Sequence, residues 1–285
     1  MNIKTTFLIT AIFFGLLGRA NAGFVLSINY TGPGQYAPAF NSAKGTLENL
    51  LVDYQNGLVV SRSSGSSYTV GQQVSQVFIN ATVTAIDGVG GILGQAGPTE
   101  TVTDVLSFTL ATDGIMRFDS ADVEGLFSSG RLEPVILHEM AHVLGFGTLW
   151  TENGVYVNGT GEFTGVRATA AWMSEFGQVG TPDVELGGGA GTANGHWNEV
   201  DGGGGLTGIR DTAGRDMRDE IMTGWLNPNS FISNMTVQSF VDIGFTGVTA
   251  VPEPGSLALL FLGIGAVGGV RLRSRMRGSK VNCSS

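Results

Sequence analysis

The first half of the chain shows apolar residues at helical or alternating spacing, and these patterns predict its elements. Helical spacing of leucines predicts a helix over 41–54, and alternation of β-branched with polar residues predicts a strand over 75–87. The glycine-rich stretch 88–98 is expected to form a loop. Two further strands are predicted over 105–112 and 114–118.

Two helices follow, and the pattern then becomes irregular. A short helix over 119–130 is closed by Gly130, and Pro134 suits the first turn of a second helix that Gly145 is placed to end. After this helix glycine is dense and strands are hard to assign, until a last helix over 235–245. Periodicity alone therefore indicates a mixed α+β domain with an irregular second half.

The N-terminus has the order of parts of a secretory signal peptide. Lys4 provides the positive start, residues 7–18 form an apolar core, and small residues end at Ala22, where cleavage is expected. An amphipathic first helix fits less well because the run is apolar all round. Residues 1–22 are therefore expected to be a signal peptide that directs export.

The C-terminus combines a Pro-Glu-Pro break, a short apolar run and a cluster of arginines. About sixteen apolar residues span 255–270, barely enough for a transmembrane helix, and four arginines follow within 271–277. This order of parts resembles the PEP-CTERM sorting signal of Gram-negative bacteria. The resemblance implies that residues 251–277 hold the chain transiently in the inner membrane until an exosortase-type enzyme removes them, leaving the protein at the cell surface or in the extracellular matrix. A plain membrane anchor is the alternative.

Between these two segments the chain is acidic and has no cysteine. Seven of the 15 Lys and Arg residues and one of the 24 Asp and Glu residues lie in the terminal segments, which leaves eight basic and 23 acidic residues in 23–250. That balance argues against nucleic acid and anionic membrane surfaces as partners. The sole cysteine is Cys283, so this exported region has no disulfide and depends on burial, with or without a metal, for its stability.

Two of the three histidines stand four residues apart in the sequence HEMAH. On a helix, His138 and His142 lie on one face and can bind the same metal ion. Glu139 is placed to take a proton from a metal-bound water during attack on a carbonyl and to deliver it to the leaving amine. The motif also occurs by chance in helices, but here it uses two of only three histidines. We therefore interpret it as part of a catalytic zinc site.

A catalytic zinc ion requires a third protein ligand. Thr148 stands where a compact zinc-protease motif would have its third histidine. His196 is the remaining histidine of the chain, 54 residues after His142, and we predict that it returns to the metal. A carboxylate ligand, Glu162 or Glu175, is the alternative.

Three blocks of the sequence together resemble the leishmanolysin family of zinc metalloproteases. HEMAHVLGF resembles the start of the metzincin signature, GHWNE resembles the setting of a distant third histidine, and DEIMTGWLN supplies the methionine of the tight turn that metzincins place beneath the zinc. Carried over by position, the resemblance assigns Glu139 as the catalytic base and Met222 as the methionine of this Met-turn. The zinc ligands are then His138, His142 and His196.

The resemblance also implies an architecture. An N-terminal lobe, 23–148, would hold a mixed sheet and the zinc-binding helix, and a glycine-rich C-terminal lobe, 149–250, would hold the third ligand and the Met-turn. Substrate would lie extended along an edge strand, for which 114–118 is the candidate. The chain departs from the family in two respects: it has no cysteine near the N-terminus to block the zinc, and an extra loop precedes the Met-turn. Met217 in that loop is the alternative candidate for the methionine of the Met-turn. The spacing of the aspartates in the loop matches no calcium-binding loop.

These inferences predict an exported, zinc-dependent endopeptidase that acts on proteins or peptides. The alternative is a non-catalytic matrix or surface protein with a structural zinc site. The intact Glu139 counts against that alternative, because a structural site has no use for a base at this position.

Overall fold

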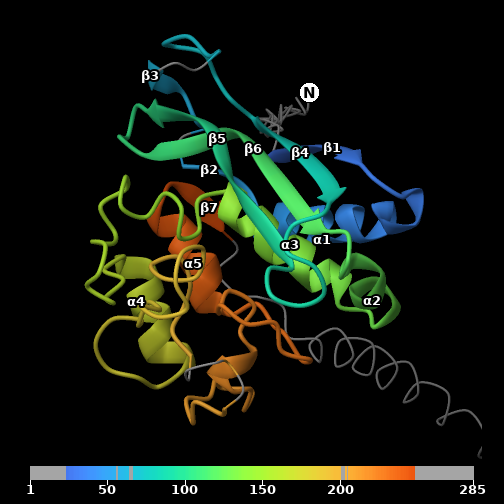
Figure 1. Cartoon of the computed structure of the whole chain (residues 1–285). Helices are drawn as coiled ribbons and strands as arrows, with labels where there is room; N and C mark the ends of the chain where they lie inside the picture. The colour runs from blue at the N-terminus through green and yellow to red at the C-terminus, as the bar shows by residue number, and fades with distance from the viewer. Residues whose placement is uncertain (1–23, 56, 64–66, 200–202, 204, 248–285) are drawn as a thin grey trace, which may run out of the picture.

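The computed structural model describes residues 24–247, apart from 56, 64–66, 200–202 and 204. The predicted signal peptide and sorting tail therefore lie outside the described residues. Within the described part of the chain, no helix is both long enough and apolar enough to cross a bilayer. The described chain has a mixed α and β fold around a five-stranded sheet, as expected from the sequence (Figure 1).

The main sheet contains parallel and antiparallel strands. The described strands are β1 (Val25–Thr31), β2 (Leu51–Tyr54), β3 (Val60–Ser63), β4 (Gln76–Thr84), β5 (Gly94–Asp104), β6 (Thr109–Asp119) and β7 (Phe245–Gly247). The sheet order is β1-β4-β6-β5-β3. β1 and β6 run parallel to β4 on either side of it, whereas β5 is antiparallel to β6 and to β3. β2 and β7 form a separate antiparallel pair.

The helix that carries the HEMAH motif lies at the centre of the molecule. The described helices are η1 (Gly34–Tyr36), α1 (Ala37–Leu50), α2 (Val123–Ser128), α3 (Leu132–Val143), α4 (Val166–Glu175), η2 (Met217–Asp219) and α5 (Asn234–Asp242). α3 contacts α1 as well as strands β5 and β6 of the sheet (Figure 1). α4 and α5 pack against each other in the C-terminal half. The motif helix thus packs against both the sheet and α1.

Strand β6 is an interior strand of the sheet, and two predictions are wrong there. The two strands predicted over 105–112 and 114–118 are one strand, β6, preceded by a turn. Because β6 pairs with β4 on one side and with β5 on the other, residues 114–118 are not an edge strand. Among the described residues, β3 pairs only with residues 102–104 of β5, so the earlier part of β5 has no partner strand on the side away from β6.

Two further boundaries differ from the predicted pattern for a common reason. β5 begins at Gly94, inside the stretch expected to be a loop, and the helix expected over 41–54 ends at Leu50 and continues as β2. In both places the segment pairs with another strand, since β5 forms a hairpin with β6, and Leu51 pairs with the distant Gly247. Pairing with a partner strand overrides local periodicity.

The glycine-rich second half is held by a buried aromatic cluster. The rings of Phe146, Trp150, Phe163 and Trp197 lie with their centroids 4.5–5.3 Å apart in neighbouring pairs. All four side chains are fully buried. Such aromatic pairs contribute roughly 0.5–1.5 kcal/mol each beyond their buried area. This half is therefore irregular in secondary structure but packed in its interior.

Helices α4 and α5 cap one another. Glu175, the last residue of α4, accepts hydrogen bonds from the backbone N–H groups of Asn234 (3.0 Å) and Met235 (2.9 Å) at the start of α5. Asp242, the last residue of α5, accepts hydrogen bonds from the backbone N–H groups of Arg167 and Ala168 at the start of α4. Each carboxylate satisfies otherwise unpaired N–H groups and interacts favourably with the positive end of the partner helix.

Asp119, at the end of β6, holds the loop that leads into β5. Its Oδ2 accepts hydrogen bonds from the N–H groups of Ile86, Asp87 and Gly88, and its Oδ1 accepts from Ala121. The backbone N–H of Ala121, together with those of residues 86–88, lowers the pKa of this carboxyl to about 2. The ionised carboxylate therefore stabilises the loop on which the start of β5 depends.

We expect Asp119→Asn to lower the thermal midpoint of unfolding in a pH-dependent way. The pKa of about 2 lies below the ordinary value of 3.8, so the ionised carboxylate contributes stability above about pH 4 that is lost as the pH falls towards 2. The difference in midpoint between wild type and variant should be largest at neutral pH and shrink on acidification. Asp122→Asn, at a carboxylate that accepts from a single N–H group of the same loop, should have a smaller effect. A midpoint difference that stays constant from neutral to acid pH would contradict this assignment.

Candidate metal centre

Helix α3 presents two histidines to the same side. His138 and His142 are one turn apart, and most of the remaining residues of α3 are apolar and buried, which fixes the orientation of the helix. Gly145 ends the helix at φ 112°, a conformation that favours glycine. Thr148 stands where a compact motif would have its third histidine. Its hydroxyl donates a hydrogen bond of 2.6 Å to the carbonyl oxygen of His142 and so satisfies a carbonyl at the end of the helix.

The distant histidine reaches the helix through a close contact between two glycines. A Cβ placed on Gly147, which has φ 70°, would lie 2.3 Å from the carbonyl oxygen of Gly195. No other residue type permits this approach of the two backbones. The next residue, His196, is thereby brought beside α3. The sequence contains both glycines, in GFG and NGH, but their spacing does not indicate that they contact each other.

The three histidine rings point one nitrogen each at a common centre. The Nε2 atoms of His138, His142 and His196 lie 3.0 Å from one another in all three pairs. Each Nδ1 faces a backbone carbonyl oxygen: Ile221 at 2.7 Å from His138, Phe146 at 2.9 Å from His142, and Thr192 at 2.8 Å from His196.

The backbone partners determine the tautomer of every ring. A carbonyl oxygen can only accept, so each Nδ1 carries the hydrogen and each Nε2 has a lone pair directed at the centre. Three lone pairs cannot hydrogen-bond to one another, and desolvation by burial lowers the pKa of all three rings, that of His196 to about 3. The arrangement is therefore complete only with a cation other than a proton.

The donor set fits a zinc ion. Within the described residues, these histidines are the one group of three or more His, Cys, Asp or Glu side chains whose ligand atoms lie close enough to share a metal. Three neutral imidazoles with backbone partners on the far nitrogen are a common set of catalytic zinc ligands. Zn–N bonds of about 2.0–2.1 Å at tetrahedral angles separate the nitrogens by about 3.3 Å, close to the separation found here.

Glu139 lies beside the histidine cluster and is buried. It is 6 % exposed, and burial raises the pKa of its carboxyl to about 8. A divalent cation at the neighbouring histidines would favour the ionised form and oppose this shift. The start of β5 lies against it, because a Cβ on Gly94 would be 2.6 Å from Glu139 Oε1. Gly94 is a site residue that the sequence pattern did not reveal.

We expect Gly94→Ala to lower kcat/KM for peptide hydrolysis by roughly 10-fold to 100-fold, because the added methyl group displaces the Glu139 carboxylate and small misplacements of this kind can cost about 10². The protein should remain folded. Gly125→Ala in α2 is the control, since a Cβ there meets no atom within 4 Å and the residue lies outside the proposed site. Equal activities of the two variants would contradict the role given to Gly94.

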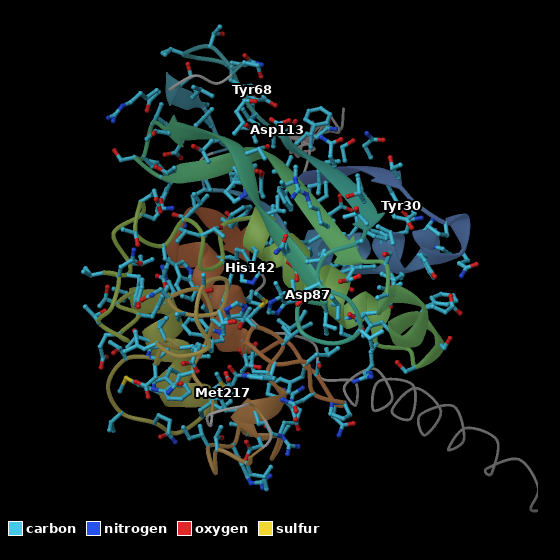
Figure 2. All side chains as sticks on the ribbon, viewed as in Figure 1. Tyr30, Tyr68, Asp87, Asp113, His142 and Met217 are labelled. Carbon is cyan, nitrogen blue, oxygen red and sulfur yellow. The ribbon has the colours of Figure 1, made fainter. Side chains whose placement is uncertain are left out.

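The two candidate methionines lie in different places. Met222 is 1 % exposed, and its carbonyl oxygen accepts a hydrogen bond of 3.0 Å from the N–H of Trp197, the residue after His196. The preceding residue, Ile221, supplies the carbonyl oxygen that faces His138. Met217 is well separated from His142 in Figure 2 and lines a cavity of about 190 Å³ beside α4. Of the two, Met222 is therefore the one beside the histidines.

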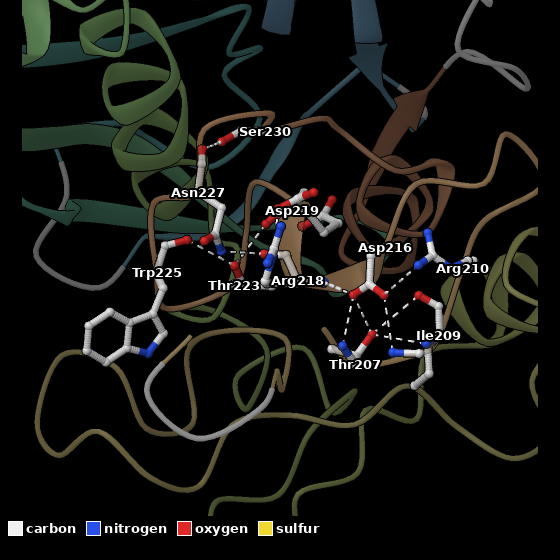
Figure 3. Close-up of polar contacts among 12 residues, drawn as sticks. Thr207, Ile209, Arg210, Asp216, Arg218, Asp219, Thr223, Trp225, Asn227 and Ser230 are labelled. Carbon is white, nitrogen blue, oxygen red and sulfur yellow. Dashed lines mark hydrogen bonds and ion pairs between the residues drawn. The ribbon is translucent and has the colours of Figure 1, made fainter. Parts of the chain in front are cut away.

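The loop between the third histidine and Met222 is ordered by its own aspartates. Asp216 accepts hydrogen bonds from the N–H and hydroxyl of Thr207, from Gly208 and from Arg218 (Figure 3). Asp211 similarly accepts from backbone N–H groups and from the side chain of the arginine four residues later. Asp211 and Asp216 thus serve as hydrogen-bond acceptors for the chain itself.

The carboxylates considered as alternative ligands lie outside the cluster. Glu175 caps α5, as described above, with both of its oxygens engaged. Glu162 accepts a hydrogen bond from the hydroxyl of Thr181 and lies in a bridge with Asp183. The structure thus brings His138 and His142 together with the third histidine and with neither carboxylate.

Comparison with known families identifies two segments of the chain. The family model for leishmanolysin, peptidase family M8, matches residues 101–250, just over half of the chain. The model for the PEP-CTERM protein-sorting motif matches residues 250–275, which supports export and surface sorting in a Gram-negative bacterium with processing by an exosortase-type enzyme. No match was found among curated proteins. The leishmanolysin match includes all three histidines and Glu139, and the chain belongs to the leishmanolysin family of metallopeptidases.

Proposed function

We propose that the chain is an exported zinc endopeptidase in which His138, His142 and His196 hold the metal and Glu139 is the catalytic base. The observation that carries this proposal is the convergence of three Nε2 lone pairs, two of them from the helix that also carries the buried Glu139. A structural zinc site normally has four protein ligands, whereas three ligands leave a position for water and substrate.

The residues of the chain divide the chemistry between them. A zinc ion bound there supplies a water of lowered pKa and polarises the substrate carbonyl. The Glu139 carboxylate takes a proton from water as the water oxygen forms a bond to the peptide carbon. It then delivers this proton to the peptide nitrogen as the C–N bond breaks, so that an acid and an amine leave. The three backbone carbonyls set the tautomer and the orientation of the imidazoles, and burial keeps the rings neutral.

We propose that the outer edge of β5 aligns the substrate. Within the described residues, no strand pairs with β5 between Gly94 and Thr99 on the side away from β6, and this outer edge begins against Glu139. An extended peptide can add to such an edge through main-chain hydrogen bonds, which give affinity with little dependence on sequence. The scissile bond would then lie at the start of β5.

The finer family assignment belongs to the same proposal. We assign the chain to the metzincins, with an N-terminal lobe of residues 23–148, a C-terminal lobe of residues 149–250 and Met222 in the Met-turn. Residues 1–22 would direct export as a signal peptide. The tail, residues 251–277, would associate with the inner membrane until processing releases the enzyme to the cell surface or matrix.

Inhibition by a peptide hydroxamate tests whether the site has an open metal position. We expect hydrolysis of an unfolded protein by the zinc-loaded full-length chain to be blocked by the hydroxamate and unaffected by the corresponding carboxamide, which binds metal poorly. A chain that holds zinc but neither binds the hydroxamate nor cleaves protein would instead be a surface protein with a structural metal site.

A further inference from the structure

We infer that Glu220 is a positioning residue whose buried carboxylate ties the start of α5 to the turn at Met222 and so maintains the geometry of the histidine cluster. The inference rests on the proposed function, because it concerns the metal affinity of that cluster. Glu220 lies in the DEIM block of the sequence, yet neither the spacing of the histidines nor the leishmanolysin resemblance gave it a role.

The carboxylate of Glu220 is fully engaged by donors. It is 1 % exposed. Its Oε2 accepts a hydrogen bond of 2.6 Å from the N–H of Met222. Its Oε1 accepts from the N–H of Ser233 (3.0 Å), from the hydroxyl of Ser233 (2.9 Å) and from the hydroxyl of Thr236 (2.6 Å). These four hydrogen bonds satisfy the buried carboxylate and join the turn at Met222 to the start of α5.

The direction of the hydrogen bonds in this network is determined. The indole N–H of Trp197 can only donate, and it donates to the Thr236 hydroxyl oxygen at 2.8 Å. The hydroxyl proton of Thr236 is then free for Glu220. The N–H of Thr236 likewise donates to the hydroxyl oxygen of Ser233, whose own proton has its nearer acceptor in Glu220 Oε1, at 2.9 Å against 3.2 Å for the Thr236 hydroxyl oxygen. Every member of the network therefore donates towards the one carboxylate.

The network reaches two of the three histidines through their backbone neighbours. Ile221, between Glu220 and Met222, presents the carbonyl oxygen that faces Nδ1 of His138 at 2.7 Å. Trp197, whose indole donates into the network, directly follows His196. The outer partner of one proposed ligand and the chain segment of another are thus anchored to the same carboxylate. Loss of such outer partners typically lowers metal affinity by about 10–100-fold.

Glu175 provides a matched control for a role limited to stability. It is a half-buried glutamate that, like Glu220, accepts backbone N–H donors at the start of α5. Its hydrogen bonds go to Asn234 and Met235, and none of them goes to the turn at Met222. If anchoring of α5 were all that mattered, Glu175→Gln and Glu220→Gln would behave alike.

The test compares zinc affinity in the full-length wild type, Glu220→Gln and Glu175→Gln, measured by competition with a chromophoric chelator. Glutamine keeps the size of glutamate but places an NH₂ donor against Met222 N–H or against the donors of Ser233 and Thr236. We expect Glu220→Gln to weaken zinc binding by about 10–100-fold and Glu175→Gln to change it by less than about 3-fold. Both variants should unfold at lower temperature than the wild type.

Cobalt substitution supplies a readout of ligand geometry that a loss of stability alone would not change. The visible absorption of the Co²⁺-loaded chain should shift in Glu220→Gln and match the wild type in Glu175→Gln. If Glu220→Gln does not yield folded protein, Thr236→Val removes the hydroxyl that joins Trp197 to the carboxylate, and it should weaken zinc binding to a smaller degree.

Several results would overturn the inference. These are wild-type zinc affinity in folded Glu220→Gln, an equal loss of affinity in Glu175→Gln, or, in the fallback case, an unchanged affinity in Thr236→Val. Each would leave the zinc site itself standing, because the wild type would still bind the metal. A wild-type chain that binds no zinc would overturn the proposed function and this inference with it.

Discussion

Glu139→Gln is expected to lower kcat for peptide hydrolysis by about 10²–10⁴-fold while zinc binding is retained. The magnitude is that of a general acid–base catalyst in hydrolysis. Glutamine has the size of glutamate and fits the same buried position, but it cannot accept a proton from water at neutral pH. Because the proposed ligands are three histidines and do not include Glu139, the metal content of the variant should equal that of the wild type.

The measurement pairs single-turnover hydrolysis of a fluorescent peptide with metal analysis of the same sample. A catalytic base affects the chemical step, so kcat should fall much more than substrate affinity. Glu152→Gln is a suitable control, since that glutamate is exposed at the surface. Retention of most of the activity by the zinc-loaded Glu139→Gln variant would rule out the mechanism.

His196→Ala is expected to abolish both tight zinc binding and hydrolysis. The change removes one of three convergent nitrogens, so its effect should exceed the roughly 10–100-fold loss that follows removal of an outer partner. The same variant tests whether a histidine 54 residues from the helix motif completes the site. Zinc affinity measured by chelator competition gives the answer without an activity assay.

Two variants act as controls for the third ligand. Glu162→Gln should keep zinc because that side chain lies outside the histidine cluster. Thr148→Ala should also keep zinc, because Thr148 contributes only a hydrogen bond to the carbonyl of His142. Tight zinc binding in His196→Ala, or its loss in Glu162→Gln, would contradict the ligand set.

The helix part of the site could be predicted because its geometry is local. The spacing of His138 and His142, with Pro134 near the start and Gly145 at the end, predicts a helix with both rings on one face, and α3 has this form. His196 was predicted by elimination, from the small number of histidines. How it arrives could not be predicted, because that depends on the backbone contact between Gly147 and Gly195.

The sheet was predicted less well because most of its pairing is long-range. β5 consists largely of glycine, proline, threonine and acidic residues, a composition of weak strand propensity, and it forms against β6. α4 was missed because the glycine-dense segments around it obscured a ten-residue helix that is stabilised by packing on α5. The supporting carboxylates Asp119 and Glu220 were missed for a similar reason, since their donors come from other segments of the chain.

The most direct test of the account measures zinc content and proteolysis on one preparation of the full-length chain. The account predicts one zinc ion per chain and cleavage of an unfolded protein, both lost on treatment with a chelator and both restored by added zinc. A chain that binds zinc with the same reversibility, yet leaves the unfolded protein uncut before and after zinc addition, would contradict the assignment as a peptidase and would leave a structural metal site.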